Sequence, residues 1–184
     1  SEVLEQLLRT FDNIKNWTNL SIPSGLQFRA EHFPFDEVAA SAVAQCLNPH
    51  PDTVRVVVKP TGITLWGDRL LVEILLRNLV ANALQHTAEG SVTLAAEADR
   101  DDARFAHITV ADTGTGMDAE TLENLFRADK PLTTPTHTGH GFGLILCRYI
   151  IKLHDDNTLR GCRIWAESHP GAGTVMHLHL ALQP

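Results

Sequence analysis

The sequence predicts an α/β domain built around one core. Segments rich in β-branched residues, such as residues 54–58 and 105–111, alternate with longer stretches of helical period, of which residues 68–87 are the clearest. The chain has 184 residues, of which 43% are hydrophobic and 20% are charged, close to the averages of globular proteins. This length is sufficient for one domain and a short additional segment. The composition argues against intrinsic disorder.

The N-terminal part predicts an amphipathic helix, because its apolar residues recur at spacings of three and four. They form one stripe along residues 3–20: Leu4, Leu7, Leu8, Phe11, Ile14, Trp17 and Leu20. The stripe fits either a helix packed on its own domain or one half of an intermolecular bundle, and the pattern favours neither. Pro23 and Gly25 end this helix.

The elements expected after this helix alternate between strands and helices. They are a strand at 28–35, a helix at 36–46, strands at 54–58 and 63–66, a helix at 68–87, strands at 91–96 and 105–111, helices at 118–126 and 141–154, and strands at 163–167 and 174–182. Asp36 and Asp68 are expected to be the N-caps of their helices. Residues 127–140 have no periodicity and contain two prolines and four threonines, as is typical of functional lids or disordered loops.

The net charge and the cysteine content limit the kinds of ligand and the cellular compartments that fit this protein. The net charge of −7 argues against a nucleic-acid binder or a general binder of anionic membranes. Binding of a small anionic ligand is still compatible with this charge, because backbone amides can bind phosphate. Three cysteines without regular spacing indicate a reducing compartment, and no apolar run reaches the ~20 residues that a membrane span needs. We expect a cytoplasmic domain without direct membrane contact, and any membrane anchor of a longer parent protein would lie upstream.

The helix at residues 68–87 carries the first candidate site. Asn78 and Asn82 are four residues apart and so share one largely apolar face. Asparagine is a poor residue for a helix interior and costly to bury without partners. A ligand would explain the pair, since amide oxygens suit Mg²⁺; the alternative is two satisfied core amides.

The second candidate is the end of the strand at residues 105–111. There Asp112 precedes the turn Gly114-Thr115-Gly116, whose glycines allow a ligand to approach the backbone closely. Asp112 can accept a hydrogen bond from an adenine amino group but not from a guanine carbonyl, which would give base selectivity. The alternative is an ordinary Asp/Gly turn.

The third candidate is a run of alternate glycines that leads into the helix at residues 141–154. Free amides and the positive end of the helix dipole make such a start suitable for phosphate. The run is Gly139, Gly141 and Gly143, followed by Leu144. It lacks the Gly-Lys-Ser/Thr of a P-loop and does not open a βαβ unit.

In this order, the three segments resemble the ATP-binding catalytic domain of sensor histidine kinases, within the superfamily shared with gyrase, Hsp90 and MutL. Asn78-Leu79-Val80-Ala81-Asn82-Ala83 is similar to the N box of that family, residues 112–117 to its G1 box and residues 139–144 to its G2 box. Residues 125–127 look like a reduced F box. The resemblance covers residues 26–182, and residues 1–22 resemble the end of the second helix of a dimerisation and phosphotransfer bundle. We therefore expect a bundle part at 1–22 and an ATP-binding catalytic domain at 26–184.

The resemblance implies a two-layer α/β sandwich, with a mixed, mostly antiparallel sheet covered by helices on one face and preceded by the N-terminal helix. Asn82 would be the Mg²⁺ ligand, Asn78 would help to shape the metal and phosphate site, and Asp112 would bind the adenine amino group. The residues expected to contact ATP or shape its site are Asn78, Asn82, Asp112, Gly114, Gly116, Lys130, Gly139, Gly141, Gly143 and Leu144.

The implied activity is transfer of the γ-phosphate of ATP to a histidine on the first bundle helix, and onward to an aspartate of a response regulator. No histidine precedes His32 here, so the phosphoacceptor is not expected in this sequence and no catalytic residue is assigned. Hydrolytic relatives carry a glutamate where this chain has Asn78, so fast hydrolysis is not expected. The expected partners are the chain's own bundle, a response-regulator receiver domain and, in the full-length protein, a second copy in a homodimer.

Two departures from the family pattern keep an alternative function open. Gln85 stands where the N box usually has a basic residue, and the F box lacks its second aromatic. Lys130, Arg127 or a histidine of the lid would have to supply the missing charge. The alternative is a nucleotide-binding regulatory module without phosphotransfer. A serine-directed kinase of the anti-sigma type is a third reading, against which the bundle-like N-terminal helix argues.

Four histidines in or beside the predicted strands are expected to be surface or partly buried polar residues: His107, His169, His177 and His179. His177 and His179 alternate on one face of their strand. That spacing can bind a metal, but no third ligand is evident in the sequence.

Overall fold

Five strands form the central sheet, in the order β2-β4-β5-β7-β6. The computed structural model describes residues 28–46, 52–126 and 141–184. The strands are β2 (Val54–Val58), β4 (Gly90–Ala98), β5 (Phe105–Asp112), β6 (Arg163–Ser168) and β7 (Thr174–Ala181). β2 pairs with β4 in parallel, and the other neighbouring pairs are antiparallel. The mixed, mostly antiparallel sheet expected from the sequence is therefore confirmed.

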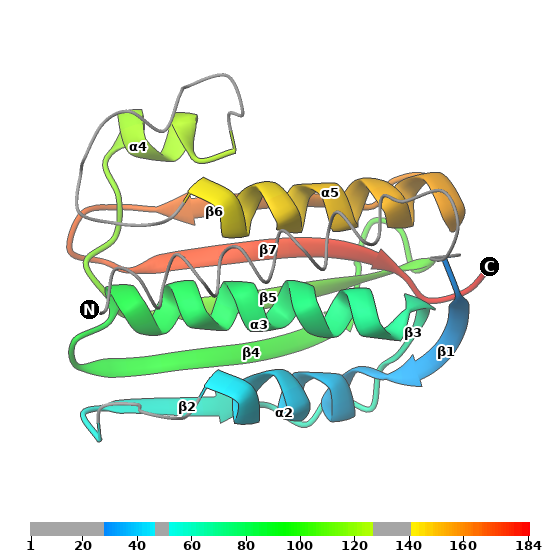
Figure 1. The fold of residues 1–184 in the computed structure, drawn as a ribbon, viewed down its shortest axis with the longest axis horizontal. Coiled ribbons are helices and arrows are strands. Elements are labelled where there is room, and N and C mark those ends of the chain that lie inside the picture. The colour runs from blue at the N-terminus through cyan, green and yellow to red at the C-terminus, as the bar shows by residue number, and fades with distance from the viewer. Residues whose placement is uncertain (1–27, 47–51, 127–140) are drawn as a thin grey trace.

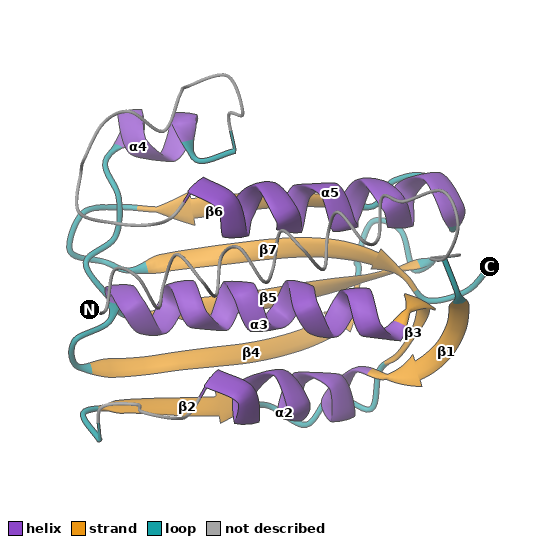
Figure 2. Ribbon diagram, in the orientation of Figure 1, coloured by secondary structure: helices purple, strands orange, loops and turns teal. Residues whose placement is uncertain are grey.

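Among the described residues, three helices cover one face of this sheet, and they lie side by side (Figure 1). They are α2 (Phe35–Cys46), α3 (Arg69–His86) and α5 (Gly141–Asn157), with α3 packed between the other two. Figure 2 shows the resulting two layers, one of helices and one of strands. The space between the layers is apolar: Leu75, Leu76 and Leu79 of α3 are buried with Ile108 and Val110 of β5. Burial of each such leucine or isoleucine contributes about 1.5–3 kcal/mol, which makes this interface the main source of stability.

A second, smaller sheet lies at one end of the sandwich. β1 (Ala30–Pro34) pairs antiparallel with β3 (Thr64–Asp68), so β2 and β3 belong to different sheets although they are neighbours in sequence. Asp68 is the N-cap of α3, as expected, because its carboxylate accepts a hydrogen bond from the Leu71 amide at 3.1 Å. This cap fixes the first turn of the helix that carries the asparagine pair.

The expectation that Asp36 caps its helix was wrong. α2 begins at Phe35, and Asp36 lies within its first turn. The Asp36 carboxylate instead accepts hydrogen bonds from the Thr61 amide at 3.0 Å, the Thr61 hydroxyl at 2.6 Å and the Gly62 amide at 3.3 Å. These bonds lower the pKa of Asp36, and they tie the start of α2 to the loop between β2 and β3.

A short helix, α4 (Ala119–Asn124), follows β5 and packs beside β6. The amphipathic helix expected at residues 3–20 and the lid expected at 127–140 lie outside the described residues. Within the described ranges, no helix is long and apolar enough to cross a membrane. The described cysteines form no disulfide, and Cys147 and Cys162 are buried.

Candidate nucleotide-binding site

Asp112 lies at the end of β5, in the middle of the sheet, and its carboxylate is held by two backbone amides. Oδ1 accepts hydrogen bonds from the Gly114 amide at 2.9 Å and from the Thr174 amide at 3.3 Å. Burial raises the pKa of Asp112, against the effects of these two bonds and of the nearby His86, which lower it. The hydrogen bonds that the structure gives this carboxylate all use Oδ1, so the described residues leave Oδ2 for a donor of a ligand.

The two turn glycines after Asp112 are required by close backbone contacts. A Cβ atom on Gly114 would come within 3.0 Å of the His86 carbonyl, and one on Gly116 would come within 3.0 Å of the His169 carbonyl. Gly116 also has a φ of +67°, in the left-handed region that glycine adopts without strain. Gly114 and Gly116 therefore serve first to let the turn pass between α3 and the connection from β6 to β7.

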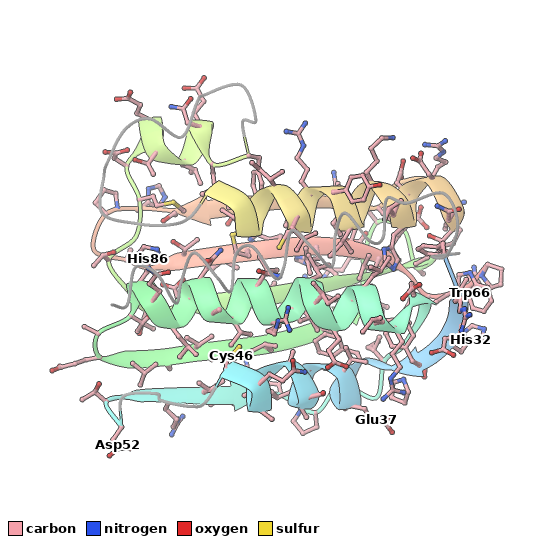
Figure 3. The ribbon with its side chains drawn as sticks, viewed as in Figure 1. His32, Glu37, Cys46, Asp52, Trp66 and His86 are labelled. Carbon is pink, nitrogen blue, oxygen red and sulfur yellow. The ribbon has the colours of Figure 1, made fainter. Side chains whose placement is uncertain are left out.

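Main-chain hydrogen bonds hold the turn against both neighbours. The Thr115 amide donates to the His86 carbonyl at 3.2 Å, and the Thr115 carbonyl accepts from the Gly171 amide at 2.7 Å. Figure 3 labels His86, which lies at the last turn of α3. The turn is thus fixed on one side by the helix of the asparagine pair and on the other by the loop that joins β6 to β7.

Three residues near this turn were not identified from the sequence: Ser168, Gly173 and Thr174. The Ser168 hydroxyl accepts from the Met117 amide at 2.8 Å and donates to the Gly173 carbonyl at 2.9 Å. Gly173 has a φ of +76°, and a Cβ there would come within 3.0 Å of the Asp112 carbonyl. The available signal in the sequence was the run Pro170-Gly171-Ala172-Gly173, which lies between the two strands predicted at 163–167 and 174–182.

Asn78 and Asn82 lie half-buried on α3, one turn apart on the same face. The Asn78 side-chain amide donates to the Ile74 carbonyl at 2.8 Å, so Oδ1 is the atom left for another partner. That oxygen faces the first turn of α5, because a Cβ on Gly143 would lie 3.3 Å from it. The structure gives the Asn82 side chain no hydrogen bond to a described residue. The asparagine pair therefore lies between the turn after β5 and the start of α5.

The side-chain oxygens of the asparagine pair suit a Mg²⁺ ion that is bound mainly by the oxygens of a phosphate-containing ligand. Amide oxygens are hard, neutral ligands of the kind that Mg²⁺ accepts. Among the described residues, no three side chains of the types His, Cys, Asp and Glu come together as a metal-binding group. The protein would thus supply one or two amide oxygens, and phosphate oxygens and water would supply the remaining ligands.

The glycine-rich segment is only partly within the described residues. Gly139 and Lys130 lie outside them, and Gly141 begins α5. Gly143 is half-buried against Asn78, whereas the Leu144 side chain is buried in the hydrophobic core. A role of Leu144 toward phosphate would therefore use its backbone amide at the helix start and not its side chain.

The sandwich, with one face of its sheet covered by helices, is the fold of histidine kinase catalytic domains. The catalytic domain of histidine kinase ThkA superposes with a TM-score of 0.68 over 86% of this chain and 98% of that one, at 24% identity. Full-length ShkA, solved in complex with AMPPNP, gives a TM-score of 0.74 over 97% of this chain and 36% of that one, at 18% identity. At these identities the likeness establishes the fold alone.

The sequence itself establishes the family. The family model described as histidine kinase-, DNA gyrase B- and HSP90-like ATPase matches residues 67–184, and the chain belongs to this family. Sensor protein EvgS of Escherichia coli O157:H7 is 29% identical over 168 residues, which make up 89% of this chain and 13% of that protein. Sensor histidine kinase GacS of Pseudomonas protegens is 31% identical over 137 residues, or 71% of this chain and 14% of that protein. The chain thus spans only about a seventh of the length of these curated relatives.

Proposed function

We propose that this chain is the ATP-binding catalytic domain of a sensor histidine kinase. It would position ATP and Mg²⁺ so that the γ-phosphate passes to a histidine of a dimerisation bundle and then to an aspartate of a response regulator. The main support for the proposal is that three elements lie together. The turn after Asp112 is hydrogen-bonded to His86 at the end of α3, and the asparagine pair on the same helix faces Gly143 at the start of α5 through Asn78. Membership of the ATPase family supports ATP as the ligand.

Recognition of adenine is assigned to Asp112. The Gly114 and Thr174 amides fix Oδ1, which orients the carboxylate before any ligand binds. Oδ2 can then accept a hydrogen bond from the amino group of adenine. Guanine has a carbonyl oxygen at that place, and two acceptors facing each other would be unfavourable. The domain should therefore bind ATP in preference to GTP.

Binding of the phosphates is assigned to α3 and the start of α5. Asn82 would be the Mg²⁺ ligand, and Asn78 would help to shape the site through the Oδ1 atom that faces Gly143. Bound Mg²⁺ supplies charge neutralisation for the triphosphate. The amides of the first turn of α5 and the positive end of the helix dipole would add to it. Lys130 and Gly139 belong to this proposal through the sequence alone.

Slow hydrolysis follows from the chemistry of Asn78. A glutamate at this position would serve as a general base for an attacking water, and an amide has no such capacity. The amide of Asn78 is also engaged with the Ile74 carbonyl. The domain would then act by positioning and by charge stabilisation, while the nucleophile comes from the bundle.

The proposal extends to the partners and the location of the parent protein. Residues 1–22 would belong to the bundle and residues 26–184 to the catalytic domain, and the bundle would make the full-length protein a homodimer. A response-regulator receiver domain is the proposed acceptor, and the structure of ThkA in complex with the response regulator TrrA supports this kind of partner. A domain that uses cellular ATP in such a relay would work in the cytoplasm.

The test is calorimetric titration of ATP and of GTP, each with Mg²⁺, into the 184-residue chain. We expect saturable binding of ATP, weaker binding of GTP, and at least a tenfold loss of ATP affinity in Asp112→Asn and in Asn82→Ala. Two matched controls should bind ATP as the wild type does: Asp101→Asn in the exposed turn after β4, and Asn157→Ala at the end of α5. Equal affinity for ATP and GTP, or wild-type affinity in both site variants, would overturn the proposal.

A regulatory module without phosphotransfer is the second candidate, because Gln85 is exposed on α3 where the family pattern has a basic residue. Addition of a histidine-containing bundle domain separates the two. Transfer of ³²P from [γ-³²P]ATP to the bundle histidine supports the kinase, and ATP binding without any transfer supports the regulatory module.

A further inference from the structure

Three histidines gather on the face of the central sheet that α2, α3 and α5 do not cover. His107 of β5 stands opposite His179 of β7 in the strand register, and His177 of β7 stands opposite Trp165 of β6. Their neighbours Ile108 and Leu178 are buried in the core on the helix side, so by alternation the histidines point to the other side. We refer to His107, Trp165, His177 and His179 as the outer-face cluster.

The rings of the outer-face cluster are in direct contact. Nε2 of His107 lies 2.8 Å from Nδ1 of His177, at hydrogen-bonding distance. The indole of Trp165 stacks on His177, with ring centroids 4.9 Å apart and the planes inclined by 6°. His177 and His179 are more buried than expected. The sequence predicted surface or partly buried residues, but their exposed fractions are only 9% and 8%.

His179 has a charged partner at each of its two ring nitrogens. Nδ1 accepts a hydrogen bond from Nε of Arg163 at 3.3 Å, so the proton of the neutral ring is on Nε2. Nε2 lies 2.8 Å from Oδ2 of Asp99. This side chain has a partner for each ring nitrogen without taking up a proton.

His177 is held differently, because one of its ring nitrogens lacks a hydrogen-bond partner. Nε2 of His177 is the one buried side-chain nitrogen or oxygen without such a partner among the described residues. The carboxylate of Glu167 approaches it to 3.7 Å, which is beyond hydrogen-bonding distance. A proton on His177 would attract Glu167, but it would also place a charge in a buried site beside His107.

The charged and titratable groups around the cluster come from every neighbouring strand. They are His107 on β5, Arg163 and Glu167 on β6, Glu97 on β4 opposite His107, and Asp99 and Asp102 in the turn after β4. Burial is the main cause that lowers the pKa of both His177 and His179; Glu167 and Asp99 oppose this effect only in part.

We propose that the outer-face cluster is a proton-responsive element, in which uptake of protons by the stacked imidazoles weakens the packing of β6 and β7 and the nucleotide site at their ends. The same two strands carry Ser168 and Thr174, which are paired in the register and hold the turn after Asp112. Glu167, the partner that a protonated His177 would attract, directly precedes Ser168. The effect on nucleotide binding rests on the proposed function, whereas the effect on stability does not.

The sign of the pH dependence follows from the lowered pKa values. Below about pH 6.5, the ordinary value for histidine, the unfolded chain takes up protons that folded His177 and His179 still exclude. The stability that depends on these neutral rings is therefore fully present above pH 6.5. It falls as the pH drops from 6.5 toward the lower folded-state pKa values.

The first experiment measures urea unfolding at about pH 7.5 and about pH 5.5 for the wild type, His177→Gln and the control His32→Gln. His32 is exposed on β1 beside Trp66 (Figure 3). We expect the urea midpoint of the wild type and of the control to fall between the two pH values, and the fall to be at most half as large in His177→Gln. Buried His154 adds its own pH dependence to all three proteins, so the difference between them is the informative quantity. An equal fall in all three would overturn the proposal.

A second experiment avoids any change in the cluster. In Trp17→Phe/Trp66→Phe, Trp165 is the remaining tryptophan, and a charged imidazole stacked on an indole quenches its fluorescence. We expect the emission of the folded protein to fall with a midpoint below pH 6.5. A midpoint at or above 6.5, or no change down to pH 5, would contradict the proposal.

ATP titration at the same two pH values tests the link to the site. We expect the wild type to lose at least threefold more ATP affinity at the lower pH than His177→Gln does. Equal losses would contradict the link between the cluster and the site. Absence of ATP binding at pH 7.5 would refute the proposed function instead, and the unfolding and fluorescence experiments would still decide on the cluster.

Discussion

Gly173 lies directly against the main chain of Asp112, so closely that a Cβ atom on Gly173 would come within 3.0 Å of the Asp112 carbonyl oxygen. This approach brings the start of β7 to the end of β5 and lets the Thr174 amide reach the Asp112 carboxylate. The carboxylate that we assign to adenine is therefore oriented by a residue 62 positions away in the sequence.

The contact between Gly173 and Asp112 can be tested against a neighbour with the same backbone conformation. Gly171 and Gly173 both have a φ of +76°, but a Cβ on Gly171 would meet nothing within 4 Å. We expect Gly171→Ala to lower the free energy of unfolding by about 1–2 kcal/mol, the usual cost of a left-handed alanine. Gly173→Ala should cost clearly more, because the strands must also move apart. Urea unfolding measures the loss of unfolding free energy in both variants. Equal losses would show that the close approach of Gly173 to Asp112 adds nothing to the cost of the substitution.

Ser168 acts on the site through its neighbours. Its hydroxyl bonds the Met117 amide and the Gly173 carbonyl, so Ser168→Ala leaves both without this partner. We expect a loss of about 1–3 kcal/mol in the free energy of unfolding. ATP affinity should also fall, although Ser168 is not assigned a contact with ATP.

The control for Ser168 is Ser41→Ala on α2, whose hydroxyl donates to Glu73 at 3.0 Å. This variant should bind ATP as the wild type does. Wild-type ATP affinity in Ser168→Ala at a temperature where the variant is fully folded would contradict the positioning role.

Replacement of Asp112 by asparagine should have opposite effects on stability and on ATP binding. Burial raises the pKa of Asp112 in the folded state, so the ionised carboxylate is less favourable there than in the unfolded chain. At neutral pH this difference lowers the stability of the wild type, and it vanishes below the unfolded value of about 3.9, where both states are protonated. The side-chain amide of the Asp112→Asn variant would keep an oxygen that accepts from Gly114 and Thr174.

We therefore expect Asp112→Asn to have a higher urea midpoint than the wild type at pH 7 and a smaller advantage at pH 4, while its ATP affinity is reduced. Circular dichroism at the two pH values, together with the ATP titration, measures this. A variant less stable than the wild type at pH 7 would show that the carboxylate stabilises the fold.

His154 and Gly67 form a contact that a double-mutant cycle can measure. His154 is fully buried; its Nε2 accepts from the Asp68 amide at 3.1 Å, and Nδ1 lies 2.8 Å from the Ile150 carbonyl. A Cβ on Gly67 would lie 2.7 Å from the His154 ring. Gly67→Ala should thus destabilise the wild type, and the same change should cost less in a His154→Ala background.

We expect a coupling of about 1 kcal/mol or more between the two changes, as is usual for residues in direct contact. Gly62→Ala serves as the control, because a Cβ there meets nothing within 4 Å and its cost should be the same in both backgrounds. Additive effects of Gly67→Ala and His154→Ala would mean that β3 moves aside without cost.

The sequence determined the local parts of this protein. Helical period places Asn78 and Asn82 on one face, Asp68 was recognisable as a cap, and the strand that ends at Asp112 was evident from its β-branched residues. The order of these motifs also indicated the family, which the match over residues 67–184 confirmed. Each of these features depends on residues within a few positions of one another, and for that reason a single sequence shows them.

The tertiary structure decided what depends on pairing between distant segments. Asp36 has the sequence context of a cap, but its carboxylate binds the loop at Thr61, which only the packing of α2 brings near. Thr174 and Ser168 reach the site because β7 pairs with both β5 and β6, and the same pairing buries His177. Strand pairing depends on packing across the whole sheet and not on a local sequence pattern. These contacts could therefore be identified only from the tertiary structure.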